Sequence, residues 1–196
     1  MQFTTVISDL ILCVASIFMV MQLNRSSSFA KKAGTYGFFI IGTSAGLGSI
    51  HFWGITTLDP VYHFFVGLSN YVGVPLIGIG YFHIGINKIK EPMLLPIFGV
   101  LFLVYIVFGY FVSFPLLATI LGGLAMGVVI IASIRNLSGG TKDAAMFGIS
   151  GAILFILAGL VIGTTGAIGP ILKVDIFHVT LALAVYLLGT SLKRLG

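Results

Sequence analysis

Residues 93–113 read MLLPIFGVLFLVYIVFGYFVS and contain no Asp, Glu, Lys or Arg. A helix of this length, with a rise of about 1.5 Å per residue, crosses the roughly 30 Å hydrocarbon core of a bilayer. The apolar residues are continuous instead of alternating, which is typical of a membrane helix and not of a barrel strand. The stretch therefore predicts a transmembrane helix and makes the bilayer the main solvent of the chain.

Further runs of the same kind predict a bundle of seven transmembrane helices. The composition agrees, because 58% of the residues are hydrophobic and 8% are charged, and the mean hydropathy of +1.17 lies outside the range of soluble domains. The connections between the runs are short, so we expect an all-α, polytopic membrane protein with a single domain over residues 1–196. The other runs cover residues 4–23, 34–54, 60–87, 115–134, 144–167 and 173–192.

The basic residues predict the orientation of the bundle. Of the ten Lys and Arg residues, all but Lys173 lie in the connections on one side. The positive-inside rule then places the N-terminus outside and the C-terminus in the cytoplasm, in the plasma (inner) membrane. The basic residues form no stripe that could follow a phosphate backbone, which argues against a nucleic-acid partner. Those on the cytoplasmic side are Arg25, Lys31, Lys32, Lys88, Lys90, Arg135, Lys142, Lys193 and Arg194.

Small residues and a proline predict how the helices pack. The segments GLAMG at 123–127 and GLVIG at 159–163 each place two glycines four residues apart. This spacing lets membrane helices approach closely. Pro75 predicts a kink in the third helix, and Asn70 nearby indicates a widened interior at the same depth.

Ionisable residues gather near the predicted outer ends of four helices. The segment GLGSIHFWGITTLDPVYHF at 46–64 carries three of them, and the starts of the first and seventh helices carry the others. Ionisable groups below the membrane interface are costly, and they usually pair, face the bundle interior and serve a function. Asp59 precedes Pro60, which also predicts a simple helix cap. We expect Asp9, His51, His63 and His178 to face one cavity, with Asp59 and Asp175 at its rim.

Imidazole and carboxylate groups in a dry pocket suit Zn²⁺, which makes a bound water more acidic. The first hypothesis is therefore a zinc-dependent hydrolase that cleaves an amide or ester of a membrane lipid at the extracytoplasmic side. A carboxylate near the metal would orient or deprotonate the water. The metal ligands would be His51 and His178 with His63 or Asp175, and the proton-transferring residue would be Asp9 or Asp59.

The motifs GLGSIHF at 46–52 and DIFHV at 175–179, together with the aspartate that begins the third helix, resemble those of the CREST superfamily. This superfamily of seven-helix membrane metal hydrolases includes the alkaline ceramidases and the adiponectin-receptor proteins. The resemblance implies zinc bound by His51 and His178, with Ser44 or Ser49 and Asp59 completing the site. The superfamily's second histidine on the seventh helix has no counterpart here, so another side chain would have to replace it.

Two other functions would use the same residues. In a transporter or channel, Asp9, His51, His63 and His178 would relay protons or bind a cation, with Asn70 deeper along the path. In an electron-transfer protein, two of the histidines would bind haem axially. The expected partner is a membrane lipid or another small-molecule substrate.

Overall fold

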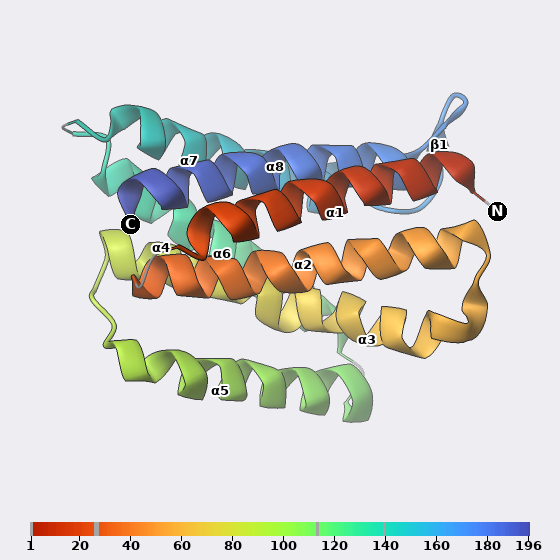
Figure 1. Ribbon diagram of the computed structural model, residues 1–196, viewed down its shortest axis with the longest axis horizontal. Coiled ribbons are helices and arrows are strands. Elements are labelled where there is room, and N and C mark those ends of the chain that lie inside the picture. Colours follow the sequence, from red (N-terminus) through yellow and green to blue (C-terminus); the bar gives the residue numbers. More distant parts are fainter. Residues whose placement is uncertain (1, 26–27, 113, 139) are drawn as a thin grey trace.

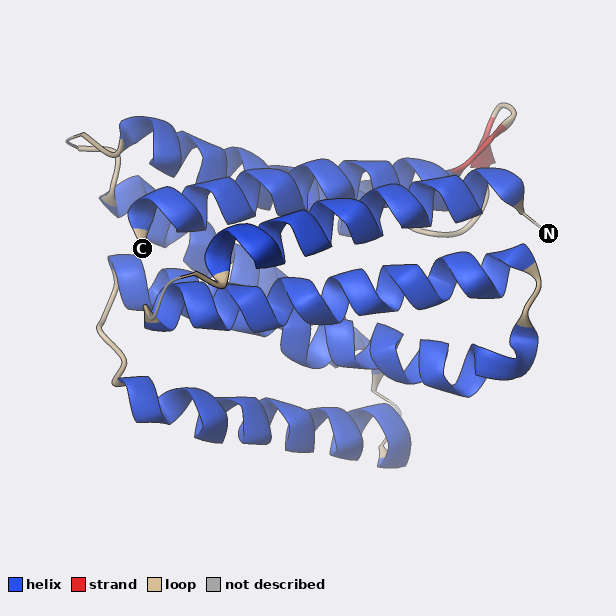
Figure 2. Ribbon diagram, viewed as in Figure 1, coloured by secondary structure: helices blue, strands red, loops and turns tan. Residues whose placement is uncertain are grey.

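The computed structural model describes residues 2–25, 28–112, 114–138 and 140–196, most of which are helical (Figure 1, Figure 2). Short 3-10 segments, η1 (Thr56–Leu58) and η3 (Glu91–Met93), precede the third and fifth α-helices. Three π-helical segments, η2 (Ser69–Gly73), η4 (Val107–Phe111) and η5 (Leu157–Ile162), continue the third, fifth and seventh. The α-helices are α1 (Phe3–Leu23), α2 (Phe29–Trp53), α3 (Asp59–Leu68), α4 (Val74–Gly85), α5 (Leu94–Ile106), α6 (Pro115–Arg135), α7 (Lys142–Ile156) and α8 (Lys173–Leu195).

Six helical segments of the described chain are long and apolar enough to cross a membrane, which fits a membrane protein. This confirms the predicted class, a helical membrane bundle. The helix α2 is equally long but is not one of the six, and its sequence includes Lys31, Lys32 and many glycines, serines and threonines. The six are Phe3–Leu23, Thr56–Gly85, Glu91–Phe111, Leu116–Arg135, Lys142–Ile162 and Lys173–Leu195.

The helical segments form a ring, with α5 outside it. In this ring α1 packs against α2 and α8, α4 packs against α2 and α6, and α7 packs against α6 and α8. Buried apolar side chains such as Phe38, Met126 and Leu188 fill much of the space between them. The helix α5 packs on η2 and α3 and stands apart at the bottom of Figure 1. Its exposed Leu95 and Leu103 suit contact with lipid.

The seventh helical segment ends earlier than the sequence predicts. The run 144–167 predicts a helix to residue 167, whereas η5 ends at Ile162. Gly163 follows with φ of 67°, a left-handed conformation that glycine adopts readily and that stops the helix. The connection then forms a hairpin in which β1 (Ala167–Ile168) pairs antiparallel with β2 (Ile171–Leu172).

The glycines of the two GxxxG segments do not make the predicted close helix contacts. A Cβ added at Gly123, Gly127 or Gly159 would meet no atom within 4 Å. Close approaches occur at other glycines. A Cβ at Gly78 would lie 2.8 Å from the Cα of Ala125, and α4 packs against α6 there. The spacing was the right kind of signal for membrane packing, but it did not identify which glycines face a neighbouring helix.

The third span changes its helical pitch beside Pro75, where the sequence predicts a kink. The π-helical turn η2 ends at Gly73, two residues before this proline. Proline has no N–H to donate and its ring collides with the carbonyl group four residues earlier, which here belongs to Tyr71. The wider π-turn accommodates this conflict without ending the helix.

Candidate functional site

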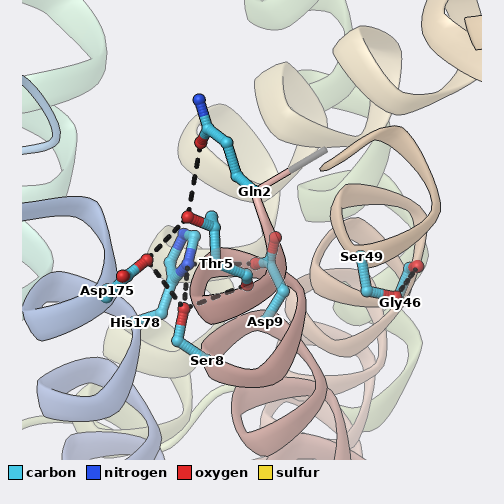
Figure 3. A network of polar contacts seen from close by, with 8 residues as sticks. All are labelled: Gln2, Thr5, Ser8, Asp9, Gly46, Ser49, Asp175 and His178. Carbon is cyan, nitrogen blue, oxygen red and sulfur yellow. Dashed lines mark hydrogen bonds and ion pairs between the residues drawn. The ribbon is translucent and has the colours of Figure 1, made fainter. Parts of the chain in front are cut away.

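The first turns of α1 and α8 face each other and hold a buried polar network (Figure 3). Thr5, Ser8 and Asp9 share one side of α1 because residues three or four apart lie on the same helical face. Asp175 and His178 share a face of α8 for the same reason. The fold thus brings together groups that are 170 residues apart in the sequence, such as Thr5 and Asp175.

Short polar contacts join the two helices. Thr5 Oγ1 donates to Asp175 Oδ1 at 2.7 Å, and His178 Nδ1 lies 3.2 Å from Asp9 Oδ1. Ser8 Oγ lies between these pairs, 3.4 Å from His178 Nδ1 and 3.5 Å from Asp175 Oδ1. Its shortest hydrogen bond, at 3.0 Å, goes to the carbonyl oxygen of Thr5. The network therefore links two carboxylates to one imidazole.

These groups are shielded from solvent. The exposed fraction is 2% for Asp9 and 8% for Asp175. If both carboxylates are ionised and the imidazole of His178 is protonated, the network still carries one net negative charge. Uncompensated charge in a low-dielectric interior is costly.

One oxygen of Asp9 is left without a hydrogen bond. Asp9 Oδ2 is buried and has no partner among the described residues. It lies against α2 at Gly48, where an added Cβ would be 2.6 Å from Asp9 Oδ2 and 3.2 Å from Tyr62 Cε2. The absence of a side chain at Gly48 is what gives the carboxylate room at this position.

A second polar pair lies closer to the surface, between α2 and α3. His51 Nδ1 is 2.7 Å from Asp59 Oδ1, and the two side chains are 28% and 29% exposed. The ring of Tyr62 stacks on His51 with centroids 4.8 Å apart, and the ring of His63 is 6.0 Å away. Because Tyr62 also lies beside Gly48, it adjoins both this pair and the site of Asp9.

The predicted helix cap at Asp59 is wrong. Asp59 is the first residue of α3, Leu58 occupies the N-cap position, and no side-chain capping bond forms. The carboxylate instead pairs with His51, an interaction between the end of α2 and the start of α3. The sequence could not distinguish these outcomes, because a first-turn aspartate suits both.

The structure places the predicted site residues in two neighbouring pairs. Asp9 pairs with His178, and His51 pairs with Asp59. Asp175 joins the first pair through Ser8, and His63 lies beside the second. Ser49 belongs to neither, because its hydroxyl donates to the carbonyl oxygen of Gly46 at 2.7 Å (Figure 3).

The donors do not fit the predicted zinc site. Within residues 2–25, 28–112, 114–138 and 140–196, no group of three or more His, Cys, Asp or Glu residues could hold a metal ion. The predicted ligands His51 and His178 belong to the two different pairs. A zinc site with three protein ligands is therefore not assembled in this structure, and the zinc hypothesis stays a prediction.

Sequence reasoning missed three polar residues of this region. Thr5 and Ser8 precede Asp9 by four residues and one residue, and Thr5 shares its helical face. That spacing could have identified Thr5 as a residue of the site. The signal is weak, because hydroxyl residues in apolar helices usually bond to their own backbone. Tyr62 gave no signal, since its place between His51 and Gly48 depends on how α3 packs on α2.

Comparison with known proteins identifies a family but no function. No curated protein and no solved structure matches the chain. Nothing connects it to the CREST superfamily, so that resemblance stays a prediction. A family model matches nearly the whole sequence, from residue 4 to residue 196. The chain belongs to this family, DUF6962, which is described as a family of unknown function.

Proposed function

We propose that this protein spans the plasma membrane seven times, with its first helix starting outside and its last ending in the cytoplasm. All basic residues except Lys173 lie at the end of the bundle where α8 finishes, which supports this orientation. We assign α2 as a membrane span in addition to the other six, because it packs against α1, α3 and α4. Protein covers much of its surface, so a less apolar sequence suffices there.

We further propose that the protein couples proton movement to the transport of a solute, with Asp9 and His178 as the proton-binding pair. One observation carries this proposal. Asp9 is buried in a membrane span, and one of its oxygens pairs with His178 while the other has no partner among the described residues. An ionisable group in that position is costly, and such groups in membrane proteins mark proton and ion pathways.

The charge balance of the network suits a carrier of one proton. With two protons shared among Asp9, Asp175 and His178, the network is neutral and compatible with the membrane interior. When one of these protons leaves, the network becomes negative and attracts the next proton or a cation. Thr5 orients Asp175 by donating a hydrogen bond to its carboxylate.

The half-exposed pair gives the proton a route to the outer side. His51 and Asp59 form a partly exposed pair at the rim. Tyr62 stacks on His51 and borders the Asp9 site at Gly48. The ring of Tyr62 thus lies between the rim pair and the Asp9 site.

The geometry supports hydrolysis less well. A serine nucleophile is activated when it bonds one imidazole nitrogen and a carboxylate orients the other. Ser8 Oγ and Asp9 Oδ1 both approach the same nitrogen, Nδ1 of His178. This arrangement can hold a proton but does not provide the triad relay. The zinc-dependent route requires a donor group that the described residues do not form.

Infrared spectroscopy tests the proton-binding site directly. For the protein in lipid, the C=O stretch of a protonated carboxylic acid should appear and disappear as the pH changes. Asp9→Asn should remove this titrating signal. Asp143→Asn is the matched control, because Asp143 lies in the first turn of α7 at the opposite end of the bundle, and it should leave the signal intact.

Proteoliposomes that contain a pH-sensitive dye test the coupling. A panel of uncharged and cationic solutes is added outside, and a transported solute should acidify or alkalinise the lumen in the wild type and in Asp143→Asn. Asp9→Asn should abolish the change. An unchanged infrared signal in Asp9→Asn, or equal proton movement in both variants, would show that the network does not carry the proton.

A further inference from the structure

A cavity lies inside the ring of helices, apart from the polar network. Its volume is about 200 Å³, and its wall comes from α2, η2, α4, α6, α7, η5 and α8. Most of the lining is apolar or glycine. The polar side chains in the wall are Ser69, Asn70 and Thr119, and none of the described lining residues is Asp, Glu, Lys or Arg.

A second cavity adjoins the first and extends toward the outer end of the bundle. It measures about 640 Å³ and lies between α3, η4 and α6. The two cavities share Asn70, Ala118 and Thr119 in their walls. The wider one also reaches His63, near the start of α3. We refer to these two adjoining cavities together as the passage.

All three π-helical segments of the described chain line this passage. Ser69 and Asn70 come from η2, Gly109 and Tyr110 come from η4, and Gly159 comes from η5. A π-helical turn is rare and frequently occurs at a functional site. Pro75 explains η2, whereas no proline lies within four residues after η5 that could explain it in the same way.

The polar groups at the junction of the two cavities are unpartnered. Thr35, Thr43 and Thr180 each donate to the carbonyl oxygen four residues earlier. By contrast, Ser69, Asn70 and Thr119 make no hydrogen bond with any described residue. Asn70 lies eleven residues after Asp59, which is about 16 Å deeper along the helix. Asn70 and Thr119 are exposed, so their hydrogen-bonding groups are open to a ligand in the cavities that they line.

We propose that the passage binds an uncharged amphiphile whose alcohol or carboxamide group hydrogen-bonds to Asn70. The amide of Asn70 can both donate and accept a hydrogen bond, which matches either group. The apolar part of the ligand fills the smaller cavity, among Met126, Leu181 and Val185. A charged head group is disfavoured, because no oppositely charged side chain lines the passage.

This site does not depend on the proposed proton-coupled transport. Asp9, His51 and His178 line neither cavity. Two glycines of the GxxxG segments, Gly123 and Gly159, line the smaller cavity together with Gly122 and leave it open. A Cβ added at any of them would meet no atom within 4 Å, so a larger side chain can enter the space without displacing a helix.

Photolabelling tests the proposal. The probe is a medium-chain primary alcohol with a diazirine on its chain, added to the full-length protein in lipid nanodiscs, and the labelled residues are found by mass spectrometry. We expect labels on the cavity walls in α6 and η5. Asn70→Leu should weaken binding about fivefold, the effect of losing one hydrogen bond. Gly122→Leu should abolish the labels.

Two controls make the result decisive. Gly99→Leu places the same side chain on α5, where a Cβ also meets nothing within 4 Å and no cavity is lined, and it should label as the wild type does. A carboxylate probe of the same length should not label the cavity at neutral pH. Labelling that survives Gly122→Leu, that is unchanged by Asn70→Leu, or that is equally strong with the carboxylate would overturn the proposal.

Discussion

Replacing Gly48 with alanine should destabilise the protein, and the loss should depend on Asp9. The added Cβ would lie 2.6 Å from Asp9 Oδ2, 3.1 Å from Asp9 Cγ and 3.2 Å from Tyr62 Cε2. A real Cβ atom does not approach an oxygen that closely, so the carboxylate has to rotate. Its 3.2 Å contact with His178 Nδ1 then lengthens.

The size of the effect follows from opposing contributions. Alanine is favoured over glycine within a helix by about 1 kcal/mol. Overpacking typically costs about 1–3 kcal/mol. A weakened polar contact between membrane helices costs a further ~1–2 kcal/mol. We therefore expect the free energy of unfolding to fall by about 1–4 kcal/mol in Gly48→Ala.

Thermal unfolding in detergent measures this loss. Cys13 is the single cysteine of the sequence and is partly buried, so a thiol-reactive fluorophore reports its exposure when the protein unfolds. Gly127→Ala is the control, since a Cβ there meets no atom within 4 Å and should add only helix propensity. Equal midpoints for the two variants would refute the argument. So would an undiminished cost of Gly48→Ala in an Asp9→Ala background, where the obstructing carboxylate is absent.

Two further outcomes concern the orientation and the metal. A reporter fused after Gly196 should be accessible only from the cytoplasm, and labelling from outside intact cells would reverse the proposed orientation. The described residues form no group of three metal ligands, so elemental analysis of the purified protein for zinc tests the zinc hypothesis directly, and absence of zinc would refute it. About one equivalent of zinc that is lost in His51→Ala and His178→Ala, but kept in His83→Ala, would restore the hydrolase hypothesis.

The sequence predicted how deep the polar residues lie in the bundle better than it predicted which residues they contact. Residue counts from the helix ends placed Asp9, His51 and His178 near one end of the bundle, and the structure agrees. A count along one helix fixes height but not the direction in which a side chain points relative to other helices. His178 therefore pairs with Asp9 across α1 and α8, while His51 at a similar height pairs with Asp59 instead.

The glycines show the same limit of sequence-based prediction. The GxxxG spacing shows which residues share a helical face, but close packing also needs a partner on the facing helix. Gly151 has one, since a Cβ there would lie 2.8 Å from Leu188 Cγ, whereas Gly159 on the same segment has none within 4 Å. The difference depends on where α7 and α8 diverge around the cavity, which no local pattern in either helix encodes.

The helix α8 contributes residues to both proposed sites. Variants that alter one site at a time can separate their roles. His178 faces Asp9, while its neighbour Phe177 and the residue one turn later, Leu181, line the smaller cavity. A shift of α8 on protonation of the network would therefore also move Phe177 and Leu181 in the cavity wall. If the cavity holds the transported solute, Gly122→Leu should stop solute-driven proton movement and leave the infrared titration of Asp9 intact. Asp9→Asn should remove the titration and the proton movement but leave the alcohol probe bound. Loss of both readouts in both variants would instead indicate a general loss of the fold.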